Sequence, residues 1–160
     1  MGLDYKSPNF HSFRSYLLAK NVEEVQNYVE SYSSTWKTTG CTIKTDGWTD
    51  QCKRTLMNFS VYCPKGTVSL KSVDASDESK SADTLYKLFR DVVLFVGPEY
   101  VVHMMTDNTA NYVAAGRLLE LEFQTLFWSP CAAHCINLIF HDIGKLDEVS
   151  NVVSQASKIT

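Results

Sequence analysis

The stretch Cys41-Thr42-Ile43-Lys44-Thr45-Asp46-Gly47-Trp48-Thr49-Asp50 decides the fold of this chain. Residues 42–46 predict a short strand, and Asp46 stands where the strand gives way to a polar turn. A second stretch has the same form, since residues 101–106 are almost continuously apolar and Asp107 follows them. Carboxylates at the ends of neighbouring strands are how an α/β sheet builds a divalent-metal site. The two aspartates therefore predict such a site.

The segment after Asp50 has the alternation of half-buried strands. Met57, Phe59, Val61 and Cys63 alternate with polar residues and Tyr62. Residues 64–66 predict a turn, and residues 68–73 predict the returning strand. Residues 42–73 therefore predict a three-stranded antiparallel meander.

Helical spacing marks the rest of the chain. After an extended lead-in over residues 1–10, residues 11–35 predict a helix, and residues 82–96 predict another that ends at Gly97-Pro98. Asn108 or Thr109 can cap a third helix. That helix carries these apolar residues: Val113, Ala114, Leu118 and Leu121. A fifth strand over residues 124–128 and a helix over residues 131–143 complete the pattern.

This order predicts an α/β fold with a five-stranded mixed sheet, made of the meander and two parallel strands, and with helices on its faces. The strand at residues 42–46 would lie beside the strand at residues 101–106. Asp46 and Asp107 would then end adjacent strands, with carboxylates within about 5 Å of each other. Two carboxylates that close repel each other, and a cation would relieve the repulsion.

Composition limits the function classes. The chain has 160 residues, 44% of them hydrophobic, and a net charge of −3, so we expect one globular core without a global basic field. Its five cysteines favour reduced thiols inside a cell over a disulfide framework. The apolar runs are too short to span a membrane, and no secretory signal or basic import cluster is visible. We divide the chain into a lead-in, residues 1–38, and a core, residues 39–160.

Several segments together carry a resemblance to a known family. They are, in order, residues 40–50, residues 58–66, Lys71-Ser72-Val73-Asp74-Ala75-Ser76, residues 101–113, and Cys131-Ala132-Ala133-His134-Cys135-Ile136-Asn137-Leu138. The chain resembles the uncharacterised domain of plant transposases of the hobo/Activator (hAT) superfamily, which has a ribonuclease H-like fold.

The resemblance implies a function for several residues. Asp46 matches the family's first catalytic aspartate and Asp107 its second, and with a glutamate they would bind Mg²⁺ or Mn²⁺ for DNA strand cleavage and transfer. Cys131 and His134 match a Cys-x-x-His motif that implies a place beside the site and contact with DNA. The implied partner is DNA and the implied location is the nucleus, with the cytoplasm as the alternative.

The chain also departs from the family pattern. The catalytic glutamate lies far downstream in the family, and neither the upstream zinc-finger module nor the C-terminal dimerisation segment is matched. We therefore expect the front portion of a transposase core, truncated at its C-terminus, with weak metal binding and no autonomous catalysis. The alternatives are a non-enzymatic module that binds DNA, another protein or a second copy, and a nuclease that another chain completes.

Simpler interpretations stand beside these. Asp46 could be a turn residue and Asp107 a helix cap. Trp48 and Trp128 could stack on DNA bases, although packing in the core or partial burial is favoured for both. The cysteines and histidines of residues 131–141 invite a zinc site, which we disfavour because four converging ligands are needed. The remaining acids are expected to be solvated: Asp50, Asp74, Asp142, Asp147 and Glu148.

Overall fold

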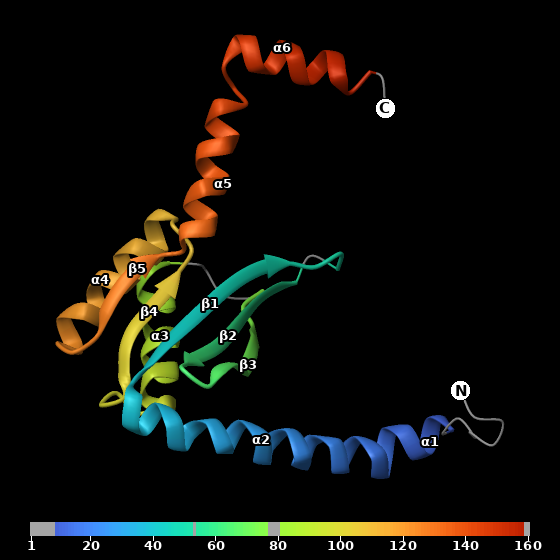
Figure 1. The fold of residues 1–160 in the computed structure, drawn as a ribbon, viewed down its shortest axis with the longest axis vertical. Helices are drawn as coiled ribbons and strands as arrows, with labels where there is room; N and C mark the ends of the chain where they lie inside the picture. Colours follow the sequence, from blue (N-terminus) through green and yellow to red (C-terminus); the bar gives the residue numbers. More distant parts are fainter. Residues whose placement is uncertain (1–8, 53, 77–80, 159–160) are drawn as a thin grey trace.

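One mixed sheet organises the structure, which is a computed structural model describing residues 9–52, 54–76 and 81–158 (Figure 1). Its strands are β1 (Cys41–Thr49), β2 (Thr55–Cys63), β3 (Gly66–Asp74), β4 (Val101–Thr106) and β5 (Phe127–Pro130). The order across the sheet is β3-β2-β1-β4-β5. β1 pairs antiparallel with β2 and parallel with β4. The predicted α/β fold is confirmed, and this mixed sheet is consistent with a ribonuclease H-like fold.

The helices begin with one long N-terminal segment. It consists of α1 (Phe10–Ser12), a π-helical turn η1 (Phe13–Leu17) and α2 (Leu18–Thr39). The others are α3 (Ala82–Val96), α4 (Ala110–Glu122), α5 (Ala132–Ile143) and α6 (Asp147–Ala156). The predicted bounds of α3 and β4 are confirmed. The N-terminal helix extends beyond the predicted residues 11–35, and α6 was not predicted.

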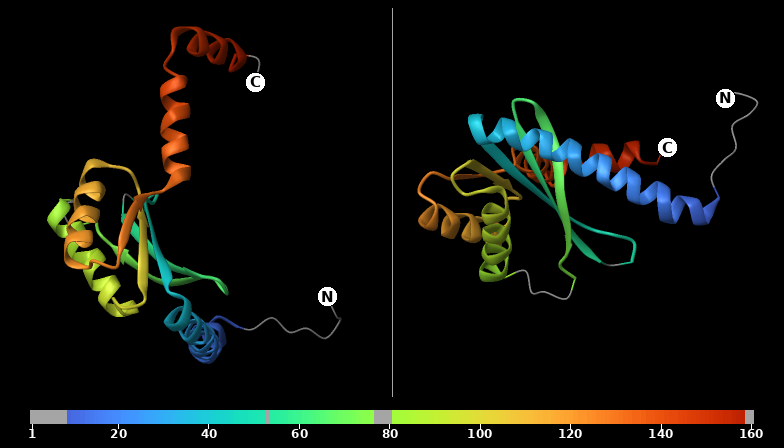
Figure 2. Two further views of the ribbon diagram at one scale, coloured as in Figure 1. Left: turned by 60° about the vertical axis from the view of Figure 1, so that its left-hand side comes forward. Right: turned by 90° about the horizontal axis from the view of Figure 1, so that it is seen from below.

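Helices α3 and α4 cover one face of the sheet (Figure 2). The apolar residues of β2 point into this layer, where Met57, Phe59 and Val61 are fully buried. The ring of Phe59 meets that of Phe89 on α3 edge-on, with centroids 6.2 Å apart, and Phe89 in turn lies 5.8 Å from Tyr112 on α4. The predicted alternation is confirmed, and the core lies between the sheet and these two helices.

The opposite face of the sheet is open: within the residues described, no helix covers it (Figure 2). Helix α2 instead runs past the end of the sheet where β1 begins, and buries Tyr32 and Trp36 there (Figure 1). Lys65, in the turn before β3, donates to the carbonyl of Ser31 on α2 at 3.1 Å. The open face therefore presents its polar side chains to solvent.

The bounds of β1 and β5 differ most from the prediction. β1 does not stop at Asp46, because β2 continues to pair with it as far as Thr49↔Thr55. Asp50 closes this hairpin by accepting from the backbone N–H of Arg54 at 2.8 Å. The fifth strand starts at Phe127 rather than at residue 124, because residues 123–126 form the turn that follows α4.

Helices α5 and α6 project away from the sheet as an arm (Figure 1). Neither helix contains a buried residue. The isoleucine side chains of α5 are solvent-exposed, with Ile139 58% accessible. No helix among the described residues is long and apolar enough to cross a membrane.

Gly116 of α4 allows Trp128 of β5 to lie against the helix. A Cβ at Gly116 would approach the indole ring to 2.4 Å. We expect Gly116→Ala to lower the free energy of unfolding by about 1–3 kcal/mol, because the ring or the helix must move. Chemical denaturation measures the change. Gly144→Ala is the control, since its Cβ would have no neighbour closer than 3.4 Å. Equal effects of the two substitutions would contradict this account.

Candidate functional site

Parallel pairing of β1 with β4 brings the two predicted acids to one place. The register pairs Lys44 with Met105. Two residues further along each strand stand Asp46 and Asp107. Since side chains alternate along a strand, both acids share the face of Lys44 and Met105. Their backbones are therefore about one strand spacing apart, roughly 5 Å.

The two acids line one shallow cavity of about 270 Å³ on the open face of the sheet. Asp46 is exposed, whereas the Asp107 side chain is only 19% accessible. The other residues around the cavity are polar or carry sulfur: Lys44, Thr45, Asn58, Ser60, Met105 and Cys131. Asn58 lies directly across from Asp46 on β2. The cavity thus gathers oxygen and sulfur donors beside one lysine.

A threonine precedes each acid and points into the core. Thr106 is fully buried, and its hydroxyl accepts from the indole Nε1 of Trp128 at 3.1 Å. The same hydroxyl donates to the backbone carbonyl of Asp107 at 2.9 Å. Thr45 is 6% exposed, and its Oγ1 is buried without a hydrogen-bond partner in the part of the chain that the structure describes. Only Asp107 is therefore anchored by its preceding threonine.

The Cys-x-x-His motif lies next to Asp107. Cys131 is the N-cap residue of α5, and its backbone N–H donates to the Thr106 carbonyl at 2.7 Å. His134 Nδ1 is 3.9 Å from Asp107 Oδ1, too long for a hydrogen bond. Asn108 Nδ2 donates to the Cys135 sulfur at 3.6 Å. The start of α5 is thereby fixed against the end of β4.

Trp48 and Trp128 differ in their surroundings. Trp128 is 5% exposed and belongs to the packed interior, as predicted. Trp48 is 48% exposed and belongs to the exposed residues, so the prediction of core packing or partial burial is wrong for it. The reason is the extension of β1 beyond Asp46, which carries Trp48 out along the hairpin on the same face as Asp46.

Tyr112 is a residue of the site that the sequence prediction missed. It stands in the first turn of α4 and is 4% exposed. Burial, followed by the negative charges of Asp107 and Asp46, raises the pKa of Tyr112 to about 12. Its hydroxyl oxygen lies beside Gly47, the residue that follows Asp46, at 2.9 Å from where a Cβ of residue 47 would be. The available signal was its position five residues after Asp107, within the stretch that resembles the family.

A family model matches residues 8–159 of this chain, and its description is a domain of unknown function, DUF659. The chain belongs to the DUF659 family. This family is found in plant hAT-like transposases. No curated protein matches the chain.

The other acids of this DUF659 domain lie elsewhere. Asp50 was predicted to be solvated, but its side chain is 11% accessible and pairs with Arg54 at 2.7 Å. The hydrogen bond from the Arg54 backbone is the main reason that the pKa of Asp50 is lowered. Asp74 is exposed and accepts from Ser76. Asp142 pairs with Lys145 on the arm, at 2.8 Å.

The described residues contain no group of three or more His, Cys, Asp or Glu side chains that could hold a metal ion. Of the residues considered for zinc, His141 is 69% accessible and lies 4.0 Å from Asp142 on the arm. Cys131 and His134 lie by the cavity instead.

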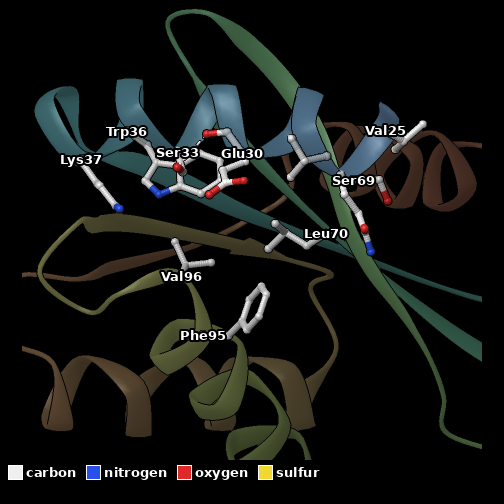
Figure 3. Close-up of a pocket in the computed structure, with 11 residues that line it drawn as sticks. Val25, Glu30, Ser33, Trp36, Lys37, Ser69, Leu70, Phe95 and Val96 are labelled. Atoms are coloured by element: carbon white, nitrogen blue, oxygen red, sulfur yellow. Dashed lines mark hydrogen bonds between the residues drawn. The ribbon is translucent and has the colours of Figure 1, made fainter. Parts of the chain in front are cut away.

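A second and larger hollow, of about 490 Å³, lies between α2, β3 and the end of α3 (Figure 3). Apolar side chains such as Leu70, Phe95 and Val96 line it, with Glu30 and Lys37 on α2 (Figure 3). The buried Nε1 of Trp36 has no partner among the described residues. This groove lies at the end of the sheet where β1 begins, and it holds none of the predicted site residues.

The two inward threonines of the DUF659 domain give a matched pair of substitutions. Thr106→Val leaves the buried Trp128 N–H without its acceptor, so we expect a loss of about 1–3 kcal/mol in the free energy of unfolding. Thr45→Val removes a hydroxyl that has no partner, so we expect no loss or a small gain. Urea denaturation of both variants measures the difference. A larger loss in Thr45→Val would refute these assignments.

Proposed function

We propose that this DUF659 domain is a transposase-like core of the hAT type, in which Asp46 and Asp107 are two ligands of a divalent cation used in DNA strand cleavage and transfer. The main support for the proposal is the parallel register of β1 and β4, because it brings both acids to one cavity. Membership of the DUF659 family supports the same function.

The donors around the cavity fit a hard cation. Two carboxylates, with the side-chain oxygens of Asn58 and Ser60 nearby, are the ligand type that Mg²⁺ and Mn²⁺ prefer. When bound, such an ion activates an attacking hydroxyl and stabilises the leaving oxygen in phosphoryl transfer. Lys44 also lines the cavity, and its ammonium lies over the ring of Tyr62, 4.7 Å from the centroid. Two carboxylates without a third acid favour weak binding.

The number of acids bears on catalysis. The described residues around the cavity include Asp46 and Asp107 and no third carboxylate. In the hAT family that the chain resembles, strand transfer uses three acidic residues. We therefore propose that the chain alone binds the cation weakly and does not cleave DNA. We also propose that the protein is located in the nucleus, where a DNA substrate would be.

A second function, DNA binding without catalysis, is supported by the exposure of Trp48. This indole shares the cavity face of β1 with Lys44 and Asp46 and is 48% exposed. Exposed aromatic rings beside a lysine form a stacking platform for unpaired bases. Because the net charge is −3, contact with DNA would depend on such a local surface.

The metal proposal predicts that Mn²⁺ binds and that Asp46→Asn or Asp107→Asn abolishes the binding, because each removes one charged ligand. Electron paramagnetic resonance of free Mn²⁺ during titration measures the bound fraction. Asp91→Asn, a change of an exposed acid on α3, is the matched control and should bind like the wild type. Unchanged binding in both cavity variants would eliminate the site.

A nicking assay tests whether the chain is catalytic by itself. Incubation of the full chain with a DNA hairpin and Mn²⁺ should leave the DNA intact if the cation site lacks a third acid. Nicking by the wild type that disappears in Asp107→Ala would show that the domain is catalytic by itself, contrary to our proposal.

The DNA-binding proposal predicts a loss of affinity in Trp48→Ala. Stacking contributes about 1–3 kcal/mol per base, so the dissociation constant for a single-stranded oligonucleotide should rise at least several-fold. Fluorescence anisotropy at one fixed salt concentration measures it. Phe95→Ala is the control, because Phe95 is 72% exposed at the other end of the domain. Equal affinities of the two variants would remove Trp48 from the DNA contact.

A further inference from the structure

We infer that Tyr112 is a positioning residue of the cation site proposed above, and that its hydroxyl, packed against Gly47, fixes the arrangement of Asp46 and Asp107. The inference rests on the proposed function, and it concerns a side chain outside the cavity lining. Tyr112 would act through the acids and would not touch the cation itself.

The surroundings of Tyr112 hold its ring in place. The residue is 4% exposed, and its ring centroid lies 5.8 Å from that of Phe89 on α3. It belongs to the hydrophobic core, together with Met57 of β2 and Leu119 of α4. A ring confined in this way has one direction open for its hydroxyl, which is toward β1.

Gly47 makes the approach of this hydroxyl to β1 possible. A Cβ at Gly47 would lie 2.9 Å from the Tyr112 hydroxyl oxygen and 3.9 Å from Asp107 Oδ2. The first distance is too short for a carbon atom, whereas the second is an ordinary contact. Gly47 is also the residue directly after Asp46. The hydroxyl of Tyr112 and the carboxylate of Asp107 therefore both lie beside the residue that follows Asp46.

The chemistry of a phenol suits this place. Two carboxylates are acceptors, and a neutral hydroxyl beside them is a donor that adds no charge. Groups that contact the metal ligands, but not the metal, hold those ligands in a binding geometry. Removal of such a group typically lowers metal affinity about 10–100-fold. The hydroxyl of the buried Tyr112 lies beside Gly47, and it is the donor to which we assign this role.

The first test compares two buried tyrosines. Tyr112→Phe keeps the ring and removes the hydroxyl, and we expect the dissociation constant for Mn²⁺ to rise about tenfold. Tyr32→Phe is the matched control, because Tyr32 is also buried, at 7% exposed, and its hydroxyl bonds to Tyr28 away from the cavity. Its Mn²⁺ affinity should equal that of the wild type.

The outcomes distinguish the inference from the function on which it rests. If Asp46→Asn abolishes Mn²⁺ binding and Tyr112→Phe does not weaken it, the cation site stands and the role of Tyr112 is refuted. Absence of Mn²⁺ binding in the wild type would refute both. Equal weakening in Tyr112→Phe and Tyr32→Phe would assign the loss to general destabilisation and would also refute the role.

A second test needs no metal. Gly47→Ala should destabilise the wild type, because the new Cβ meets the hydroxyl, and should cost little in a Tyr112→Phe background, where that oxygen is gone. Denaturation of the four proteins gives the coupling between the two positions. Additive effects would show that the hydroxyl does not occupy the space beside Gly47 and would overturn the inference.

Discussion

The parallel pairing of β1 with β4 is the constraint on which the rest of this domain depends. β1 is the central strand, held by β2 on one side and by β4 on the other. The antiparallel side fixes which face of β1 is apolar, because Ile43 lies opposite Val61 and both are fully buried. The parallel pairing with β4 determines which residues of β1 lie beside the end of β4. A shift by one residue would move either Asp46 or Asp107 to the other face.

The two threonine–aspartate pairs follow from this constraint. Alternation along each strand sends the threonine into the core whenever the aspartate faces the cavity. Burial lowers stability at Thr45, whose hydroxyl has no hydrogen-bond partner in the described part of the chain, whereas the hydroxyl of Thr106 accepts from Trp128. Unsatisfied polar groups and facing like charges both lower stability, and natural proteins tolerate them mainly where function requires it.

The sequence predicted correctly those elements that a single pattern of apolar residues defines. The bounds of α3 and β4 are those predicted, since a cap and a glycine limit the helix and the strand is apolar throughout. β1 was predicted too short, because the polar residues after Asp46 suggested a turn, whereas pairing with β2 continues to Thr49. Trp48 was misassigned for the same reason. Cross-strand pairing is a tertiary effect that local pattern does not contain.

Tyr112 was missed for a different reason. On α4 the apolar residues Val113 and Leu121 suggested the inward face, yet the helix buries Tyr112, Ala115 and Leu119 and leaves Leu121 78% exposed. A helix that is apolar on most sides does not reveal its buried face, so its orientation comes from the partner surface. Here that surface includes Trp128, which needs the bare backbone at Gly116, and Phe89 of α3, whose ring meets that of Tyr112. With α4 packed on both, the Tyr112 hydroxyl lies beside Gly47. The geometry around Asp46 and Asp107 is therefore coupled, through α4, to a packing contact in the core.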